Sequence, residues 1–258
     1  LRLLALTALG GLAGVACNSA AAATSSNPAA LAHEMSIDLL VAGKLEALPT
    51  GSQFVRVTEF IQKPAVVAQS KKHQVGIIYQ QNGTQTLTYY DAQGNPTSHV
   101  AIAAGTAVWC LTDLHTHANN GTAPNQWYFL ALWPGDDVSV VPSGMSAYQT
   151  ALIPQSALSP GAYSETLRAV TLQAGGQSAA HTLGGLEVIY MLSGTLTVNV
   201  AGQAAMHLGG INAGMYVAPD TATQEFNTGS ATASYLVYLV IPSGKAIQSN
   251  LSTPVPAS

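Results

Sequence analysis

The chain has 258 residues, enough for one large or two modest domains, and 48% of them are hydrophobic. Only 8% are charged, against about a quarter in a typical globular protein, so the surface must be polar mainly through uncharged groups. The net charge is near −4, with eight Lys and Arg residues in total. Because no basic patch can form, we expect no nucleic-acid partner.

Residues 1–23 have the pattern of an export signal. Arg2 precedes an apolar run over residues 3–16 that is too short to span a bilayer. Cleavage after the alanines at 20–23 would release a soluble protein. Cleavage before Cys17, followed by lipidation, would leave a lipoprotein, and this is the only membrane association that we expect. An alternative is a buried helix over residues 3–16. Either export route predicts a secreted, periplasmic or cell-surface protein.

Residues 24–50 are predicted to form a linker and a short helical segment. Asn27 and Pro28 are typical of a helix N-cap followed by proline at the first helical position. Apolar residues then recur at roughly helical spacing as far as Ala47, at Leu31, Met35, Leu39, Leu40 and Leu45. Residues 49–51 would end the helix.

From residue 51 the pattern is that of short strands separated by glycine turns. The apolar residues 77–79, the turn Asn82-Gly83 and the alternating residues 84–90 recur in order as residues 188–190, the turn at Gly194 and residues 195–200. Arg168 takes the place of Arg56. Such an internal repeat predicts an all-β fold of two tandem antiparallel barrels or jelly rolls. The boundaries we expect are 51–134 and 161–245, joined by a connecting segment at 135–160 and followed by a tail at 246–258.

The second repeat resembles the first signature of the cupin superfamily. Gly175, His181, Glu187 and Gly194 match its pattern of glycine, histidine, glutamate and glycine. The family's second histidine is replaced by Leu183. The second signature is matched more loosely by Gly214 and Pro219, with Gln224 at its histidine. The resemblance covers both halves and implies a bicupin, with a jelly-roll barrel in each.

A cupin metal site uses imidazoles and one carboxylate, which suit iron, manganese, nickel or zinc. In the second half the resemblance implies His181, Glu187 and Gln224 as metal ligands. The alternative is that His181 and Glu187 form a hydrogen-bonded polar pair in the barrel mouth, without a metal.

In the first half the carboxylate position is Gly76. His115 and His117 are two residues apart, so in a strand they share one face. Together with His73 they would form a three-histidine metal site without a carboxylate; the alternative is a solvated loop. We expect His33, His99 and His207 to be surface or satisfied core residues.

Cys110 lies in an apolar strand-like run, and we interpret it as a small buried residue without a disulfide. The leading functional hypothesis is an exported bicupin that binds a small molecule with little or no chemistry. The alternative is a metal-dependent dioxygenase or isomerase acting on a sugar-like or phenolic substrate. A third possibility is a structural or assembly protein, for which a homodimer is expected.

Overall fold

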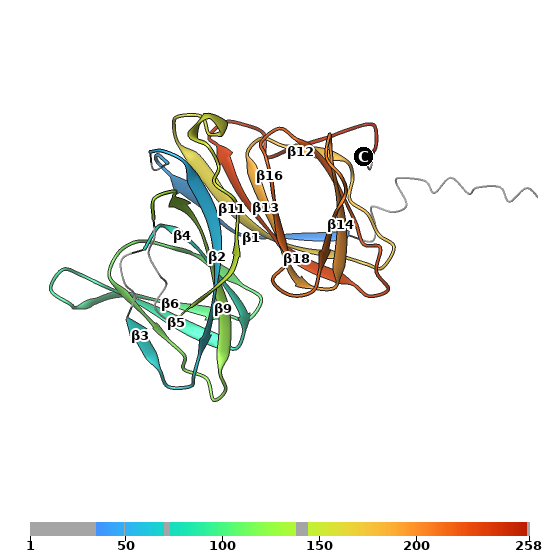
Figure 1. Ribbon diagram of the computed structural model, residues 1–258. Coiled ribbons are helices and arrows are strands. Elements are labelled where there is room, and N and C mark those ends of the chain that lie inside the picture. Colours follow the sequence, from blue (N-terminus) through green and yellow to red (C-terminus); the bar gives the residue numbers. More distant parts are fainter. Residues whose placement is uncertain (1–34, 49, 70–72, 138–143, 257–258) are drawn as a thin grey trace, which may run out of the picture.

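The computed structural model describes residues 35–48, 50–69, 73–137 and 144–256, and these form two β-barrels side by side (Figure 1). The predicted all-β fold with two tandem barrels is confirmed. Within the described ranges, the helical structure is limited to the single-turn 3-10 helix η2 (Gln155–Ala157). No helix in this part of the chain is long and apolar enough to cross a membrane. The expected export signal lies outside the described residues.

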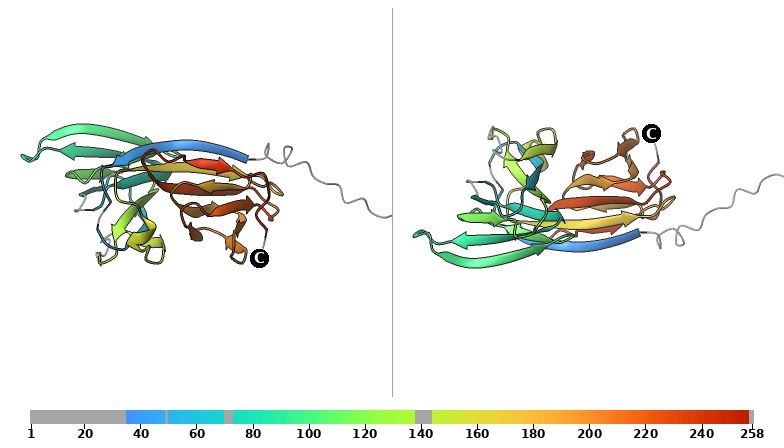
Figure 2. Two further views of the ribbon diagram at one scale, coloured as in Figure 1. Left: turned by 90° about the horizontal axis from the view of Figure 1, so that it is seen from above. Right: turned by 90° about the horizontal axis from the view of Figure 1, so that it is seen from below.

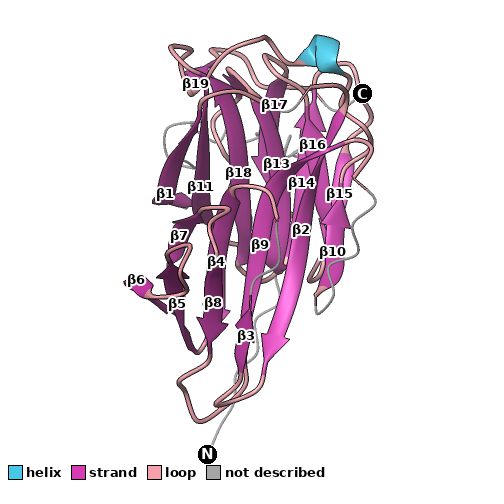
Figure 3. Cartoon of the chain, turned by 90° about the vertical axis from the view of Figure 1, so that its left-hand side faces the viewer, coloured by secondary structure: helices cyan, strands magenta, loops and turns pink. Residues whose placement is uncertain are grey.

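The N-terminal barrel consists of a five-stranded and a four-stranded sheet (Figure 3). The five-stranded sheet has the order β10-β2-β9-β4-β7, and the four-stranded sheet has the order β3-β8-β5-β6. The bounds are β2 Gln53–Gln62, β3 Val67–Gln69, β4 Gly76–Asn82, β5 Thr84–Tyr90, β6 Pro96–Ala103, β7 Ala107–Cys110, β8 His115–Ala118, β9 Asn125–Pro134 and β10 Met145–Gln149.

The C-terminal barrel consists of two five-stranded sheets. One has the order β1-β11-β18-β13-β16 and the other β15-β14-β17-β12-β19. The bounds are β1 Met35–Leu45, β11 Tyr163–Leu172, β12 His181–Leu183, β13 Leu186–Ser193, β14 Thr195–Val200, β15 Met206–Gly209, β16 Gly214–Val217, β17 Ala222–Phe226, β18 Ala233–Pro242 and β19 Gln248–Asn250.

In each barrel, one sheet has an edge strand that lies outside the repeated part of the sequence. β1 precedes the N-terminal barrel in sequence, yet it pairs antiparallel with β11 of the C-terminal barrel. β10 follows the N-terminal barrel and returns to pair with β2. Figure 2 shows β1 in blue along the edge of the C-terminal barrel. The two barrels are thus tied together by strand pairing as well as by side chains.

The helix predicted for residues up to Ala47 is wrong over Met35–Leu45, which form β1; its earlier part lies outside the described residues. A register shift between Leu39 and Val41 explains the misleading pattern. Before the shift, Met35 and Ile37 line a pocket in the C-terminal barrel, whereas Val41 and Leu45 pack against the core between the barrels. Because a β-bulge exchanges the two faces of a strand, the apolar spacing imitates that of a helix.

The long central strands are apolar on both faces because each face meets a different core. Along β18, Tyr235 and Val237 face the interior of the C-terminal barrel, while Leu236 and Tyr238 face the N-terminal barrel. β9 alternates in the same way between the interior of its own barrel and the shared core. The shared core brings the Tyr128 and Tyr190 rings to 5.3 Å between centroids. Strands buried on both faces give continuous hydrophobic runs.

One turn is repeated in atomic detail in the two barrels. The Asn119 amide donates hydrogen bonds to the carbonyl groups of Gln62 and Ala123. Asn227 donates the same pair of bonds in the C-terminal barrel, and in each case the N–H group two residues on donates to the asparagine oxygen. This repetition places β8 and β17 in equivalent positions.

Candidate functional site: two ligand clusters inside the barrels

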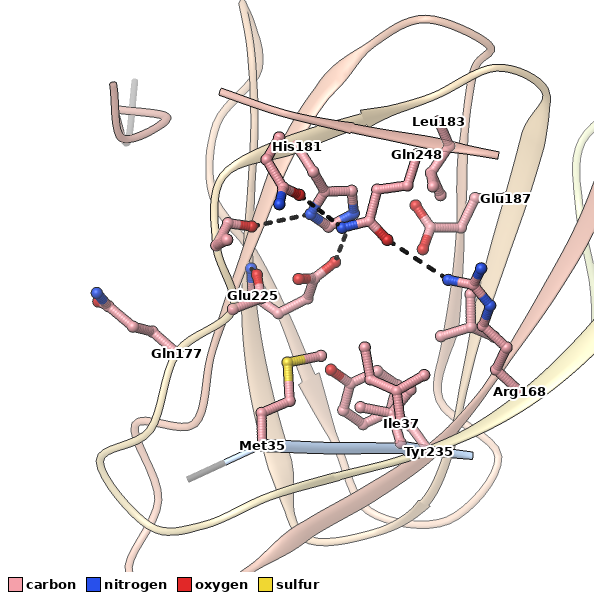
Figure 4. A pocket seen from close by; sticks show the side chains of 15 residues that line it. Met35, Ile37, Arg168, Gln177, His181, Leu183, Glu187, Glu225, Tyr235 and Gln248 are labelled. Carbon is pink, nitrogen blue, oxygen red and sulfur yellow. Dashed lines mark hydrogen bonds and ion pairs between the residues drawn. The ribbon is translucent and has the colours of Figure 1, made fainter. Parts of the chain in front are cut away.

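Three ionisable side chains meet inside the C-terminal barrel (Figure 4). His181 comes from β12, Glu187 from β13 and Glu225 from β17, and one ligand atom of each lies within 4.8 Å of the others. The Nε2 atom of His181 is 3.8 Å from Oε1 of Glu225. All three residues are buried. An imidazole with two carboxylates is a donor set suited to divalent transition metals.

The orientation of the His181 ring leaves its free nitrogen pointing into this cluster. Its Nδ1 atom is 2.9 Å from the carbonyl oxygen of Ala179. Because a carbonyl only accepts hydrogen bonds, Nδ1 carries the proton and Nε2 carries the lone pair of the neutral ring. A second hydrogen bond of this kind is the usual way in which proteins orient a metal-binding histidine.

The two buried carboxylates are poorly compensated. Burial raises the pKa of Glu187 well above its ordinary value, the negative charge of Glu225 raises it further, and Arg168 opposes the rise. Oε2 of Glu187 and Oε2 of Glu225 have no hydrogen-bond partner among the described residues. Since an unpaired buried charge is costly, a proton or a bound cation must compensate this pair.

The cluster lies in a pocket of about 200 Å³. Arg168 contributes a cationic wall, and burial lowers the pKa of its guanidinium, an effect that Glu187 opposes. Tyr235 contributes a buried hydroxyl that has no hydrogen-bond partner among the described residues. Met35 and Ile37 of β1 line the side opposite His181, where Tyr235 also lies (Figure 4). The pocket therefore combines a metal-type ligand set with a cation, a hydroxyl group and an apolar wall.

The N-terminal barrel holds a second cluster, built mostly from imidazoles. Nε2 of His115 lies 3.4 Å from Nε2 of His73 and 3.1 Å from Nε2 of His117. His115 and His117 are both buried and lie on one face of β8, as their spacing predicted. Cys110 adds its Sγ atom 3.6 Å from Nε2 of His115. His73, Cys110 and His115 have ligand atoms within 4.8 Å of one another.

All the titrating groups of the N-terminal cluster are held neutral by burial. Burial lowers the pKa of His73 and of His115. Burial, together with electrostatic coupling to His115 and His73, lowers the pKa of His117 to about 3. Burial raises the pKa of the Cys110 thiol to about 12. In the absence of a bound cation, these four groups present a thiol and neutral imidazoles.

No family model matches the sequence, and no curated protein matches it. Solved structures do match the fold. The oxalate decarboxylase of Lactobacillus farciminis, in complex with formate, is 12% identical, with a TM-score of 0.57 over 83% of this chain and 88% of that chain. A Bacillus subtilis oxalate decarboxylase studied for its Mn(II) centres is also 12% identical, with a TM-score of 0.56 over 83% of this chain and 79% of that chain. The chain has the bicupin fold.

Within this fold the structure corrects one predicted ligand. Gln224 points away from His181 and Glu187: its amide donates to the carbonyl of Ser178 and accepts from the N–H group of Val255. The neighbouring Glu225 faces the cluster instead. Successive residues of a strand face opposite sides of the sheet. An alignment error of one residue therefore selects Gln224, on the outer face, in place of Glu225, which faces the cluster. The equivalent asparagine turns show the correct alignment, because His117 and Glu225 each lie two residues before them.

The other predicted site residues lie in different places in the structure. His181 and Glu187 come together, and Leu183 lines the same pocket in place of an imidazole. In the N-terminal barrel the ring of Phe129 occupies the space in front of Gly76, where a carboxylate would extend. His99 and His207 are exposed, as expected, whereas His33 lies outside the described residues.

Glu225 and Cys110 were missed as candidate ligands. Glu225 could have been found by counting eleven residues from Gly214, the spacing of the second signature. Cys110 lies on β7 and meets His115 of β8, a strand of the other sheet, and no local motif indicates this contact.

Proposed function

We propose that this bicupin is a metal-dependent enzyme whose C-terminal barrel binds one divalent ion through His181, Glu187 and Glu225 and acts on a small carboxylic acid. The observation that carries the proposal is the meeting of one bare imidazole nitrogen with two unsatisfied carboxylate oxygens inside a pocket. A metal ion accounts for all three at once. The alternative of a hydrogen-bonded polar pair leaves both Oε2 atoms without a partner.

The charge of the pocket supports an anionic substrate. Glu187 and Glu225 are both ionised when they bind a metal, and together they neutralise a divalent ion. Arg168, which lines the same pocket, then leaves a surplus positive charge. A bound counter-charge stabilises a surplus charge that is partly shielded from water, and a monoanion supplies it.

Arg168 also supplies the right geometry for an acid. Its guanidinium is held beside the cluster by Gln248, with 3.4 Å between Nη1 and Oε1. A guanidinium binds a carboxylate through two parallel hydrogen bonds, which would orient the substrate towards the metal ligands. The Tyr235 hydroxyl is available as a further donor. The pocket volume of about 200 Å³ favours a substrate of few atoms.

The structural neighbours support the same substrate class. They are oxalate decarboxylases, one in complex with formate and one known for Mn(II) centres. At 12% identity they establish the fold alone, so the acid for this chain is proposed from its own pocket. This departs from the sugar-like or phenolic substrate expected from the sequence, and it favours the enzyme over the binding protein without chemistry.

Each residue of the pocket would have its own role in binding the ion and the substrate. His181, Glu187 and Glu225 hold the ion, which when bound acts as a Lewis acid that polarises a coordinated carboxylate. Arg168 orients the acid, and Tyr235 donates a proton in a hydrogen bond to one of its oxygens. Met35 and Ile37 give one side of the pocket an apolar wall.

The direct test is turnover. Protein reconstituted with Mn(II) or Fe(II) is incubated with a panel of small mono- and dicarboxylic acids, and products are followed by nuclear magnetic resonance. We expect at least one acid to be converted by the wild type and not by Glu187→Gln. Metal-loaded wild type that converts none of the acids would contradict the enzymatic role and favour a binding protein.

A further inference from the structure

The cluster in the N-terminal barrel is not used by the proposed function, and its nitrogen atoms face one another in an unusual way. Nδ1 of His73 is 2.5 Å from the carbonyl oxygen of Gln74, and Nδ1 of His115 is 2.6 Å from that of Asp113. Carbonyl oxygens only accept, so both Nδ1 atoms carry the protons and both Nε2 atoms carry lone pairs. These two Nε2 atoms are 3.4 Å apart.

The orientation of His117 follows from a chain of amides. The Gln80 amide nitrogen donates to backbone carbonyls, so its oxygen accepts from the amide nitrogen of Gln85. The Gln85 oxygen, 3.1 Å from Nδ1 of His117, therefore accepts from it. Nε2 of His117 is then also a lone pair, 3.1 Å from Nε2 of His115. The lone pair on Nε2 of His115 thus faces two others, and such lone pairs repel one another unless a cation lies between them.

The spacing of these atoms fits a tetrahedral metal ion. For metal–nitrogen bonds of about 2.0–2.1 Å and a metal–sulfur bond of about 2.3 Å, the tetrahedral nitrogen–nitrogen edge is about 3.3 Å and the nitrogen–sulfur edge about 3.6 Å. The observed separations are 3.4 Å between His73 and His115 and 3.6 Å between His115 and the Cys110 sulfur. The cluster is therefore close to the dimensions of a filled zinc-type site.

The thiol of this barrel lies on the strand next to the one whose equivalent carries the carboxylate in the other barrel. Cys110 lies directly opposite Gly76, in the equivalent of the pair formed by Glu187 and Val217 in the C-terminal barrel. Where one barrel has a carboxylate opposite an apolar residue, the other has a glycine opposite a thiol. The Tyr89 hydroxyl, 3.9 Å from Sγ, donates to the sulfur. A donor to the sulfur stabilises a metal-bound thiolate.

We propose that the N-terminal barrel binds a thiophilic metal ion, Zn(II), through His73, Cys110 and His115, while His117 lies beside this group, against His115. Thiolate and imidazole select zinc-type ions, whereas the carboxylates of the C-terminal cluster suit harder ions. Cys110 and His115 have no exposed surface, so no ligand position opens to solvent on their side. The two barrels would thus hold different metals.

The test uses Co(II) as a spectroscopic probe for Zn(II) on the full chain, stripped of metal with a chelator. We expect wild type to show the thiolate-to-cobalt charge-transfer band together with the intense visible bands of tetrahedral cobalt, and Zn(II) to displace them. Cys110→Ser should lose the charge-transfer band. It should also weaken Zn(II) binding by more than the roughly 10–100-fold typical of losing an outer-shell partner.

Two further variants keep the test decisive if Cys110→Ser folds poorly. His73→Ala should lose the tetrahedral spectrum with the cysteine still in place. Glu187→Gln should keep the charge-transfer band, because its site lies in the other barrel. A cobalt spectrum without a charge-transfer band in wild type, or a band that survives Cys110→Ser, would overturn the proposal. These results do not depend on whether the C-terminal barrel is an enzyme.

Discussion

Arg168 lines the C-terminal pocket on the same side as Glu187 (Figure 4) and is the cation on which the proposed substrate class depends. Its counterpart in the other barrel, Arg56, instead packs over the rings of Phe54 and Trp133, with 4.9 and 5.1 Å to their centroids. The two arginines hold equivalent places in the repeat, but only Arg168 borders a cluster with carboxylates. This difference allows a matched experiment.

We predict that Arg168→Met lowers kcat/KM for the acid by about 10- to 100-fold, because a charged hydrogen bond contributes about 1.5–3 kcal/mol. Bound metal should be unchanged. The measurement is steady-state kinetics with metal content determined on the same sample. Arg56→Met is the control and should leave kcat/KM close to that of wild type. Equal losses in both variants would mean that the arginine acts through stability.

Single residues also mark the limits of prediction from sequence. The shared face of His115 and His117 follows from strand geometry alone, and the structure brings both into one cluster. The choice between Gln224 and Glu225 required a register accurate to one residue, which loosely matched signatures do not provide. Cys110 could not be assigned a role, because its contact with His115 depends on the tertiary structure and not on a local motif.

At the scale of elements, the edge strand β1 is fitted closely to the other barrel. A Cβ atom at Gly43 of β1 would lie 2.1 Å from the ring of Trp109 on β7, and one at Gly214 of β16 would lie 2.8 Å from the ring of Tyr148 on β10. The edge strands β1 and β10 therefore each contact the opposite barrel at a glycine. The close approach is possible only without a side chain at these positions.

Gly43→Ala should accordingly destabilise the protein by about 1–3 kcal/mol, the usual cost of overpacking. Thermal and denaturant unfolding of the purified variant measure this loss. Gly209→Ala on β15 is the matched control, since its Cβ atom would make only an ordinary contact with Thr195 at 3.9 Å. A Gly43→Ala protein as stable as this control would show that β1 does not pack on β7 as described.

The pairing of β1 could not be predicted locally. Its apolar residues change faces at the bulge between Leu39 and Val41, and its partner β11 lies more than a whole barrel later in the chain. The strands from residue 51 onward were easier to predict, because the turn residues, the alternation of polar and apolar residues and the repeated order all indicated strands. Sequence patterns predict local geometry well, but they predict poorly which strands pair when these are far apart in the chain.

At the scale of the whole molecule, a buried acid lies in the core between the barrels. The Tyr238 hydroxyl donates to Oε1 of Glu165 at 2.6 Å, and Oε2 of Glu165 has no hydrogen-bond partner among the described residues. Burial raises the pKa of Glu165 to about 8, and the Tyr238 bond opposes the rise. Between the ordinary value and this value, the folded protein keeps a proton that the unfolded chain releases.

Stability should therefore be highest below the ordinary carboxyl pKa and should fall as the pH rises towards 8, by up to about 1.4 kcal/mol per pH unit. Glu165→Gln keeps an oxygen for Tyr238 and removes the charge. We expect this variant to flatten the pH dependence and to be the more stable protein near pH 8. Unfolding curves of both proteins from pH 5 to pH 8 provide the comparison, and parallel curves would contradict the buried-acid interpretation.

The central claim is that the C-terminal barrel binds a divalent metal through His181, Glu187 and Glu225. The most direct measurement is titration of chelator-stripped protein with Mn(II), with free ion followed by electron paramagnetic resonance. Wild type should bind about one Mn(II), and so should Gln224→Met, which changes only the outward-facing neighbour, whereas Glu225→Gln should bind at least about 100-fold more weakly. Wild type that binds no Mn(II), or Glu225→Gln that binds as tightly as wild type, would contradict the claim.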